Sequence, residues 1–319
     1  MKGIKQKDRL NEAVYILSRP WFLGLALGFL LIPTTRISSA LGTGAEFLKI
    51  DTDAKAVSMG SAYTAMADGV EAMRYNPSGL AGMKQVELGF SHTSWLLDTQ
   101  HDFIGVAMPA GKRSGMTIGL GLTRLSNGRI DSRNADRSVG NSHTAYDQAI
   151  TASFAGQIKK TKVGIGAKYI ESSLAGEKAS AVAFDLGLMH GLGRLPLSVG
   201  LSVQNLGTPM KYISQKDPLP LTFAAGILVN VIPGFNMAMD VKRMVYDKRT
   251  DVSFGTEYSV LPMISLRTGY LMNNSRAGTG LNAINIGAGV NFWGTQFDYA
   301  VSPYGDLGNT QKITLKKKF

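Results

Sequence analysis

From residue 85 to the C-terminus, apolar residues alternate with small or polar residues at a period of two. In one segment Met116, Ile118, Leu120 and Leu122 alternate with Thr and Gly residues. Successive side chains of a β-strand point to opposite faces, so this pattern predicts strands with one apolar face. Fourteen such segments follow one another, most of them 8–12 residues long. The pattern therefore predicts an all-β chain.

The lengths of the segments and of their connections indicate where these strands lie. A tilted strand that crosses a bilayer needs about 9–11 residues, whereas typical strands of soluble proteins have about 5–6. Short connections such as Gly111–Ser114 alternate with longer ones, predicted at Leu125–Tyr146, Ser172–Ala179 and Leu206–Leu219. An even strand count with this alternation is typical of bacterial outer-membrane barrels.

Backbone groups in hydrocarbon must all be paired, which requires the sheet to close on itself. We therefore predict a transmembrane antiparallel β-barrel of about 14 strands over residues 85–319. A soluble β-sandwich is the alternative, because it also buries apolar strand faces.

The N-terminus has the layout of a secretory signal peptide. Basic residues precede an apolar run, Trp21–Pro33, and small residues, Ser38 and Ala40, stand before a cleavage point. The run has 13 residues, fewer than the roughly 20 that a spanning helix needs. We predict a cleaved signal peptide over residues 1–40 and export to the bacterial outer membrane; a membrane anchor is the alternative.

Residues 41–84 lack the alternation of the strands and form a separate predicted unit. They contain an Ala- and Met-rich stretch with helical character, and then a turn whose key residues are Tyr75, Asn76, Pro77 and Gly79. A barrel of fourteen strands encloses a wide lumen. We therefore predict a partly helical plug, within or against the barrel mouth where the short turns lie. A helix packed on the rim is the alternative.

The same region resembles the N-terminal signature of the PorV/PorQ family, which belongs to the FadL-like group of fourteen-stranded barrels. The resemblance is carried by Phe47–Ile50, Ala54–Gly60, Tyr63–Asp68 and Asn76–Leu80. It implies a hatch-like N-terminus. It also implies one of two roles, which are passage of hydrophobic compounds and service as a barrel partner in type 9 secretion.

Composition narrows the chemistry of the chain. It has no Cys, and its net charge of +11 comes without a basic patch interleaved with aromatic residues, so no nucleic-acid partner is predicted. It contains no nucleophile elbow, no phosphate-binding loop and no close-spaced pair of His residues. We predict no enzymatic activity, cofactor or metal. The expected partners are outer-membrane lipid, a hydrophobic small molecule or secretion-system proteins.

Charged residues also fall on the inward parity of the predicted barrel. They include Glu87, Lys168, Asp185, Asp240 and Arg267. An ion-selective pore carries a ring of one sign, whereas these signs are mixed. Mixed signs favour ion pairs that tie the wall to a plug; solvated wall charges are the alternative.

A second set of candidates lies in the predicted plug. Phe47, Leu48, Met59, Met66 and Met73 are expected to form a hydrophobic pocket, because Met adapts to irregular apolar ligands. Ordinary packing of the plug against the wall is the alternative for the same residues. The sequence thus predicts a plugged outer-membrane channel for hydrophobic small molecules, with a type 9 secretion-associated barrel as the alternative.

Overall fold

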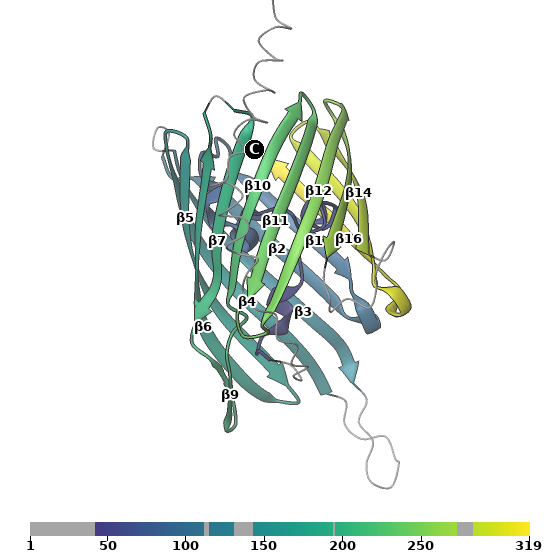
Figure 1. The fold of residues 1–319 in the computed structure, drawn as a ribbon. Helices are drawn as coiled ribbons and strands as arrows, with labels where there is room; N and C mark the ends of the chain where they lie inside the picture. Colours follow the sequence, from purple (N-terminus) through teal and green to yellow (C-terminus); the bar gives the residue numbers. More distant parts are fainter. Residues whose placement is uncertain (1–41, 112–114, 131–142, 194, 273–282) are drawn as a thin grey trace, which may run out of the picture.

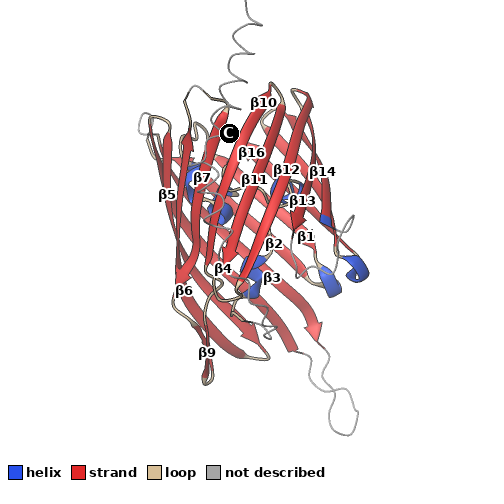
Figure 2. Ribbon diagram, in the orientation of Figure 1, coloured by secondary structure: helices blue, strands red, loops and turns tan. Residues whose placement is uncertain are grey.

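The computed structural model describes residues 42–111, 115–130, 143–193, 195–272 and 283–319. The predicted signal peptide lies outside these residues. Fourteen antiparallel strands form a closed barrel in which β1 pairs with both β2 and β16 (Figures 1 and 2). This confirms the predicted architecture and excludes the sandwich, because the sheet has no open edge.

The strands of the barrel follow the chain order, and one small hairpin stands apart from them. The barrel strands are β1 (Glu87–Ser94), β2 (Gln100–Pro109), β3 (Met116–Ile130), β4 (His143–Ile158), β5 (Thr161–Leu174), β6 (Glu177–Gly191), β7 (Leu197–Gly207), β10 (Thr222–Ile232), β11 (Phe235–Met244), β12 (Arg249–Leu261), β13 (Ile264–Met272), β14 (Ile284–Phe292), β15 (Thr295–Pro303) and β16 (Asn309–Lys318). The hairpin consists of β8 (Met210–Tyr212) and β9 (Gln215–Asp217).

The apolar parity faces outward. Leu120 is 57% exposed, whereas Thr117, on the inward parity of the same strand, is fully buried. The outer surface carries Leu, Ile, Val, Phe and Met along the strands. Such an apolar exterior is stable in lipid and costly in water, which fits a membrane-spanning wall.

The two ends of the barrel differ in their connections. At one end, the short-turn end, pairs of strands are joined by turns such as residues 159–160 and 293–294. At the other, the long-loop end, the connection over residues 208–221 contains the β8–β9 hairpin. The predicted long loop Ser172–Ala179 is wrong: β5 and β6 continue to a turn at Ala175–Gly176.

The chain before β1 lies inside the barrel, and we call residues 42–86 the inner segment (Figure 1, purple). Its short helices are η1 (Glu46–Lys49), α3 (Ala54–Ser58), α4 (Ala72–Tyr75) and η2 (Pro77–Leu80). Helix α3 packs against β13 to β16, and η2 packs against β3 to β6. None of the helices in the described ranges is long and apolar enough to cross a membrane.

The inner segment reaches further than the sequence suggested. Phe47 and Leu48 pack with Met210 of the β8–β9 hairpin, so the segment begins at the long-loop end. It ends at the short-turn end, where the Gly82 N–H donates to the Gly115 carbonyl. The predicted placement within or against the short-turn mouth is therefore corrected, because the segment runs along the whole lumen.

Inward-facing glycines make room for the inner segment. A Cβ on Gly119 would lie 2.6 Å from the Met73 sulfur. On the far side of the barrel, a Cβ on Gly255 would lie 2.5 Å from the Met59 carbonyl oxygen. Both distances are shorter than a real Cβ atom tolerates, so a side chain at either position would force its neighbour to move. The wall and the inner segment are therefore in direct contact, without space for side chains at these points.

Candidate functional site

The turn predicted from Tyr75 to Gly79 joins the inner segment to the wall. The Asn76 amide nitrogen donates to the Thr64 carbonyl at 2.8 Å. The same nitrogen lies 3.3 Å from the carbonyl oxygens of Leu188 in β6 and Leu201 in β7. The side-chain oxygen of Asn76 accepts from the Ser78 N–H at 3.2 Å and from the Ser78 hydroxyl at 2.6 Å. Asn76 thus caps η2 and binds two neighbouring strands, which a non-amide side chain cannot reproduce.

Pro77 and Gly79 fit the same turn. Pro77 occupies the first position of η2, where its missing N–H has no partner to lose. A Cβ on Gly79 would overlap the Ala67 backbone, so only glycine fits there. The hydroxyl of Tyr75 accepts from the N–H groups of Thr52 and Asp53, both at 3.1 Å.

Two wall carboxylates hold backbone N–H groups of the inner segment. Asp240 in β11 accepts from the N–H groups of Tyr63 and Thr64 at 2.9 and 2.8 Å. Glu87 in β1 accepts from the Val70 N–H at 2.8 Å. Both carboxylates are buried, and charge-assisted bonds of this kind are stronger than neutral ones.

A buried ion pair adds a third attachment. Lys316 of β16 lies 2.9 Å from Asp53, and both side chains are almost fully buried. Asp53 also caps α3 by accepting from the Lys55 N–H at 3.0 Å. One carboxylate therefore both begins a helix of the inner segment and binds the last strand of the barrel.

Other inward charges bind one another within the wall. Lys168 lies 2.6 Å from Asp185. Arg267 contacts Glu257 at 2.6 Å and Asp298 at 2.7 Å. The five predicted inward charges thus divide into two groups, since Glu87 and Asp240 contact the inner segment while Lys168, Asp185 and Arg267 pair along the wall.

Glu71 is a buried acid of the inner segment beside the Lys316–Asp53 pair. It accepts from the Ser91 hydroxyl of β1 at 2.5 Å and from the Thr52 hydroxyl at 2.8 Å. Burial, together with the charge of Asp53, raises the pKa of Glu71 from 4.5 to about 7. The inner segment therefore carries one carboxyl whose charge changes near neutral pH.

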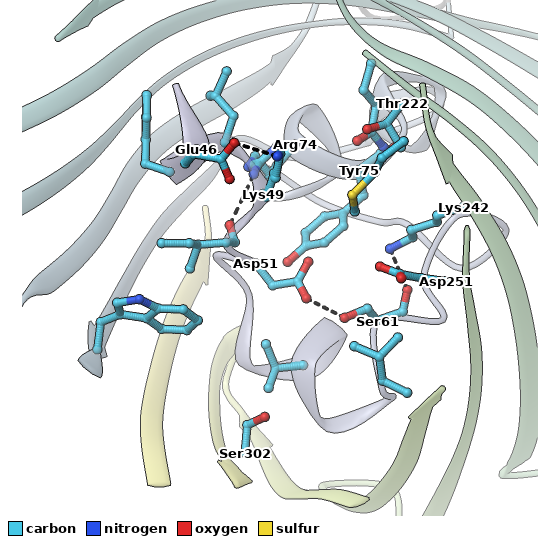
Figure 3. A pocket seen from close by; sticks show the side chains of 18 of the residues that line it. Glu46, Lys49, Asp51, Ser61, Arg74, Tyr75, Thr222, Lys242, Asp251 and Ser302 are labelled. Atoms are coloured by element: carbon cyan, nitrogen blue, oxygen red, sulfur yellow. Dashed lines mark hydrogen bonds and ion pairs between the residues drawn. The ribbon is translucent and has the colours of Figure 1, made fainter. Parts of the chain in front are cut away.

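A cavity of about 450 Å³ opens between the inner segment and the wall at the long-loop end (Figure 3). Figure 3 shows Asp51, Tyr75 and Lys242 pointing into the same space. Apolar side chains line other parts of it: Phe47, Leu48, Leu125, Met244 and Leu271. The volume lies in the range of small-molecule sites, and the lining combines apolar and charged groups.

Three cations approach this cavity through bonds to backbone carbonyls. Arg74 donates to Ile50 at 3.1 Å, and Lys242 donates to Ser61 at 2.8 Å. Lys312 donates to the Asp51 carbonyl. No sequence pattern points to Arg74, and the inward parity of Lys242 and Lys312 is the only sequence signal for the other two.

The five apolar residues predicted to form one pocket lie in two places. Phe47 and Leu48 line the cavity and pack with Met210. Met59, Met66 and Met73 belong to a different cluster, between the inner segment and the wall. The five residues therefore do not form a single pocket. Met59 and Met73 pack directly against wall glycines, Gly255 and Gly119, and their flexible side chains adapt to that surface.

Comparisons with known proteins identify similar folds. A family model described as "Uncharacterised protein family (UPF0164)" matches residues 41–128, which include the inner segment. No curated protein matches the chain. The PorV/PorQ resemblance remains a prediction.

Solved structures of transporters share the barrel. The Pseudomonas putida toluene transporter TodX is 14% identical, with a TM-score of 0.58 over 82% of this chain and 95% of that one. The Ralstonia pickettii toluene transporter TbuX is 12% identical, with a TM-score of 0.57 over 83% and 97%. A Pseudomonas aeruginosa FadL homologue is 9% identical, with a TM-score of 0.52 over 83% and 97%. At these identities the likeness is one of fold.

Proposed function

We propose that this chain is an outer-membrane channel for hydrophobic small molecules, and that the inner segment closes it in the state described here. The observation that carries the proposal is the cavity of about 450 Å³ at the long-loop end, with the inner segment as its floor. The apolar outer wall supports placement in a bilayer. The shared fold with toluene transporters supports a small, apolar cargo.

The lining of the cavity refines the expected cargo. Phe47, Leu48 and Leu271 offer an apolar surface, while Arg74 and Lys242 lie at the same space. A ligand with an apolar body and one polar group uses both parts of this lining. A pure hydrocarbon would leave the charged groups without a role, so we rank it second.

The inner segment must yield for cargo to pass. Below the cavity, Met59, Met73 and Leu80 are buried against the wall. The attachments at Asp240, Glu87 and Lys316 hold this packing in place. Passage therefore requires a local rearrangement of the inner segment, and the cavity is the site that cargo reaches first.

The proposal is tested by filling the cavity. Leu271 is 5% exposed and lines the cavity, so Leu271→Trp reduces its volume. Leu266 lies on the same strand but faces outward at 51% exposure, so Leu266→Trp is the matched control. Uptake of a radiolabelled monoaromatic compound and of an aromatic carboxylate is measured in cells with each protein in the outer membrane.

The expected result is faster uptake with the wild type than with an empty vector, lost in Leu271→Trp and kept in Leu266→Trp. Equal uptake by all four strains would overturn the proposal. Preference for the carboxylate supports a cargo with a polar group, and preference for the hydrocarbon contradicts that refinement.

A second candidate function is partner binding in type 9 secretion, as the resemblance implies. One observation favours it. Leu97 is 89% exposed at the tip of the connection between β1 and β2, and Trp95 beside it packs edge-to-face on Tyr304 at 5.2 Å. A fixed apolar tip outside the barrel is suited to a protein contact. Loss of a co-purifying protein in Leu97→Ser, with unchanged uptake, would favour this function.

A further inference from the structure

The outer wall carries a hollow at the short-turn end, far from the cavity in the lumen. It has a volume of about 530 Å³ and lies where the β4–β5 turn meets the end of β6. Its lining consists of Ile158, Lys159, Lys160, Thr161, Val163 and His190. Ile158 is 71% exposed and Val163 is 43% exposed on the outward face. The apolar part of the hollow is therefore continuous with the apolar surface of the barrel.

The rim of this hollow is basic. Lys159 and Lys160 form the turn and are both exposed. Neither has an ion-pair partner among the described residues. The sequences that meet here, residues 155–163 and 187–197, contain no Asp or Glu. The local field is positive at the level where the apolar wall ends.

The backbone of the turn gives a second reason to assign a role to these lysines. Lys159 has φ +56°, a left-handed conformation that glycine adopts at lower cost. A lysine at such a position in a two-residue hairpin is uncommon, because Asn or Gly is preferred there. The lysine therefore stands at a position whose backbone conformation favours Asn or Gly.

A histidine completes the polar side. The Thr161 hydroxyl lies 2.8 Å from His190 Nδ1, on the neighbouring strand. This contact engages Nδ1, so Nε2 is the ring nitrogen that a ligand can reach. Two ammonium groups and an imidazole thus border one end of the hollow, and Ile158 and Val163 border the other.

We propose that this hollow binds an anionic phospholipid of the surrounding leaflet. The headgroup phosphate lies among Lys159, Lys160 and His190, and an acyl chain follows Ile158 and Val163 along the outer wall. The inference rests on the proposed function, because it requires the barrel to lie in a bilayer. Charge complementarity selects an anion, and the adjoining apolar surface selects one that carries hydrocarbon.

The experiment is native mass spectrometry of the full chain in detergent, with phosphatidylglycerol or phosphatidylethanolamine added. The test variant is Lys159→Gln with Lys160→Gln, which removes two charges and keeps a polar side chain, one atom shorter, at each position. The matched control is Lys211→Gln with Lys216→Gln, a cross-strand pair of exposed lysines in the β8–β9 hairpin. Inorganic phosphate is added in a competition arm.

We expect one phosphatidylglycerol to remain on the wild type and on the control, with roughly tenfold weaker retention on the test variant. Phosphatidylethanolamine should bind poorly. Inorganic phosphate should compete poorly with phosphatidylglycerol. Equal retention on all three proteins, or equal retention of both lipids, would overturn the proposal. Displacement by inorganic phosphate alone would assign the hollow to free phosphate and also contradict a lipid site.

This result is separable from the proposed function. Slower migration of the boiled than of the unheated protein on a detergent gel shows that the barrel is assembled before lipid is added. A barrel that assembles, binds phosphatidylglycerol and takes up no cargo refutes the channel and leaves the lipid site standing. A barrel that transports cargo but shows no preference for phosphatidylglycerol supports the channel and refutes the lipid site.

Discussion

Asn76 of the inner segment lies directly against Gly187 of β6, where a Cβ would overlap the Asn76 side-chain oxygen. The Asn76 amide nitrogen meanwhile lies 3.3 Å from the carbonyl of Leu188, the next residue of that strand. The inner segment is thus registered to the wall by a missing side chain and a hydrogen bond at adjacent positions. Such an arrangement tolerates little displacement, because interiors are close-packed.

Gly187→Ala is therefore expected to loosen the inner segment while the barrel still closes. The added Cβ forces Asn76 away from β6 and breaks its contacts with the wall. Trypsin treatment in detergent measures this, since Lys55 and Arg74 are buried in the wild type and become cleavable. Gly156→Ala is the matched control, because a Cβ there meets only Met116, at 3.8 Å. Identical digestion of the two variants would contradict the registered contact.

Lys316→Met is expected to destabilise the protein strongly. It leaves Asp53 buried without its partner, and loss of one member of a buried ion pair typically costs about 3–5 kcal/mol. Lys317→Met is the control. Lys317 is the next residue of the same strand, but it binds groups of the wall, the Trp293 carbonyl and the Thr295 hydroxyl, and not Asp53. Urea unfolding in detergent micelles provides the comparison. Equal midpoints would show that the Lys316–Asp53 pair does not hold the inner segment.

Glu71→Gln is expected to change how stability depends on pH. Burial raises the pKa of Glu71 to about 7, so the folded protein binds its proton more tightly than the unfolded chain does. Between pH 4.5 and about 7 the wild type should therefore lose stability as pH rises, and the variant should lose less. The measurement is the difference in unfolding free energy between the two proteins across this range. A difference that does not vary with pH contradicts the assignment.

Leu120→Arg tests the outward face. Leu120 is 57% exposed on β3, and an arginine near the midplane of a bilayer costs about 2–4 kcal/mol. Leu97→Arg is the control, because Leu97 is 89% exposed at the tip of a loop. The free energy of folding into lipid vesicles is measured for both variants and for the wild type. A larger loss of folding free energy for Leu97→Arg than for Leu120→Arg would contradict the assignment of Leu120 to the lipid-facing surface.

The period-two pattern was sufficient to predict the barrel and its two faces. Leu120 faces outward and Gly119 inward, because alternation is a local property that burial on one side preserves. It failed at Ser172 and Glu177, where the strands extend to the turn with polar residues on both faces. Ser172 and Ser173 are buried polar residues on opposite faces of β5, so the alternation of apolar and polar positions that marks a strand is absent there.

The site was harder to predict than the fold. Parity placed Asp240 inside, but its partners are backbone N–H groups of Tyr63 and Thr64, and no side-chain pattern records them. Likewise Met59 and Phe47 are apolar whether they line a cavity or fill a packed contact. Sequence spacing gives the face of a residue, whereas the contact depends on how the inner segment turns within the lumen.

Closure of the lumen by the inner segment is the central claim, and single-channel conductance in a planar bilayer tests it most directly. The variant lacks residues 45–70, which removes Asp53, Met59 and the Asp240-bound backbone, and its assembly is checked by heat-dependent gel migration. We expect a closed wild type and a variant with large, steady conductance, since a barrel of fourteen strands encloses a wide lumen. An assembled variant that conducts no more than the wild type would contradict the account.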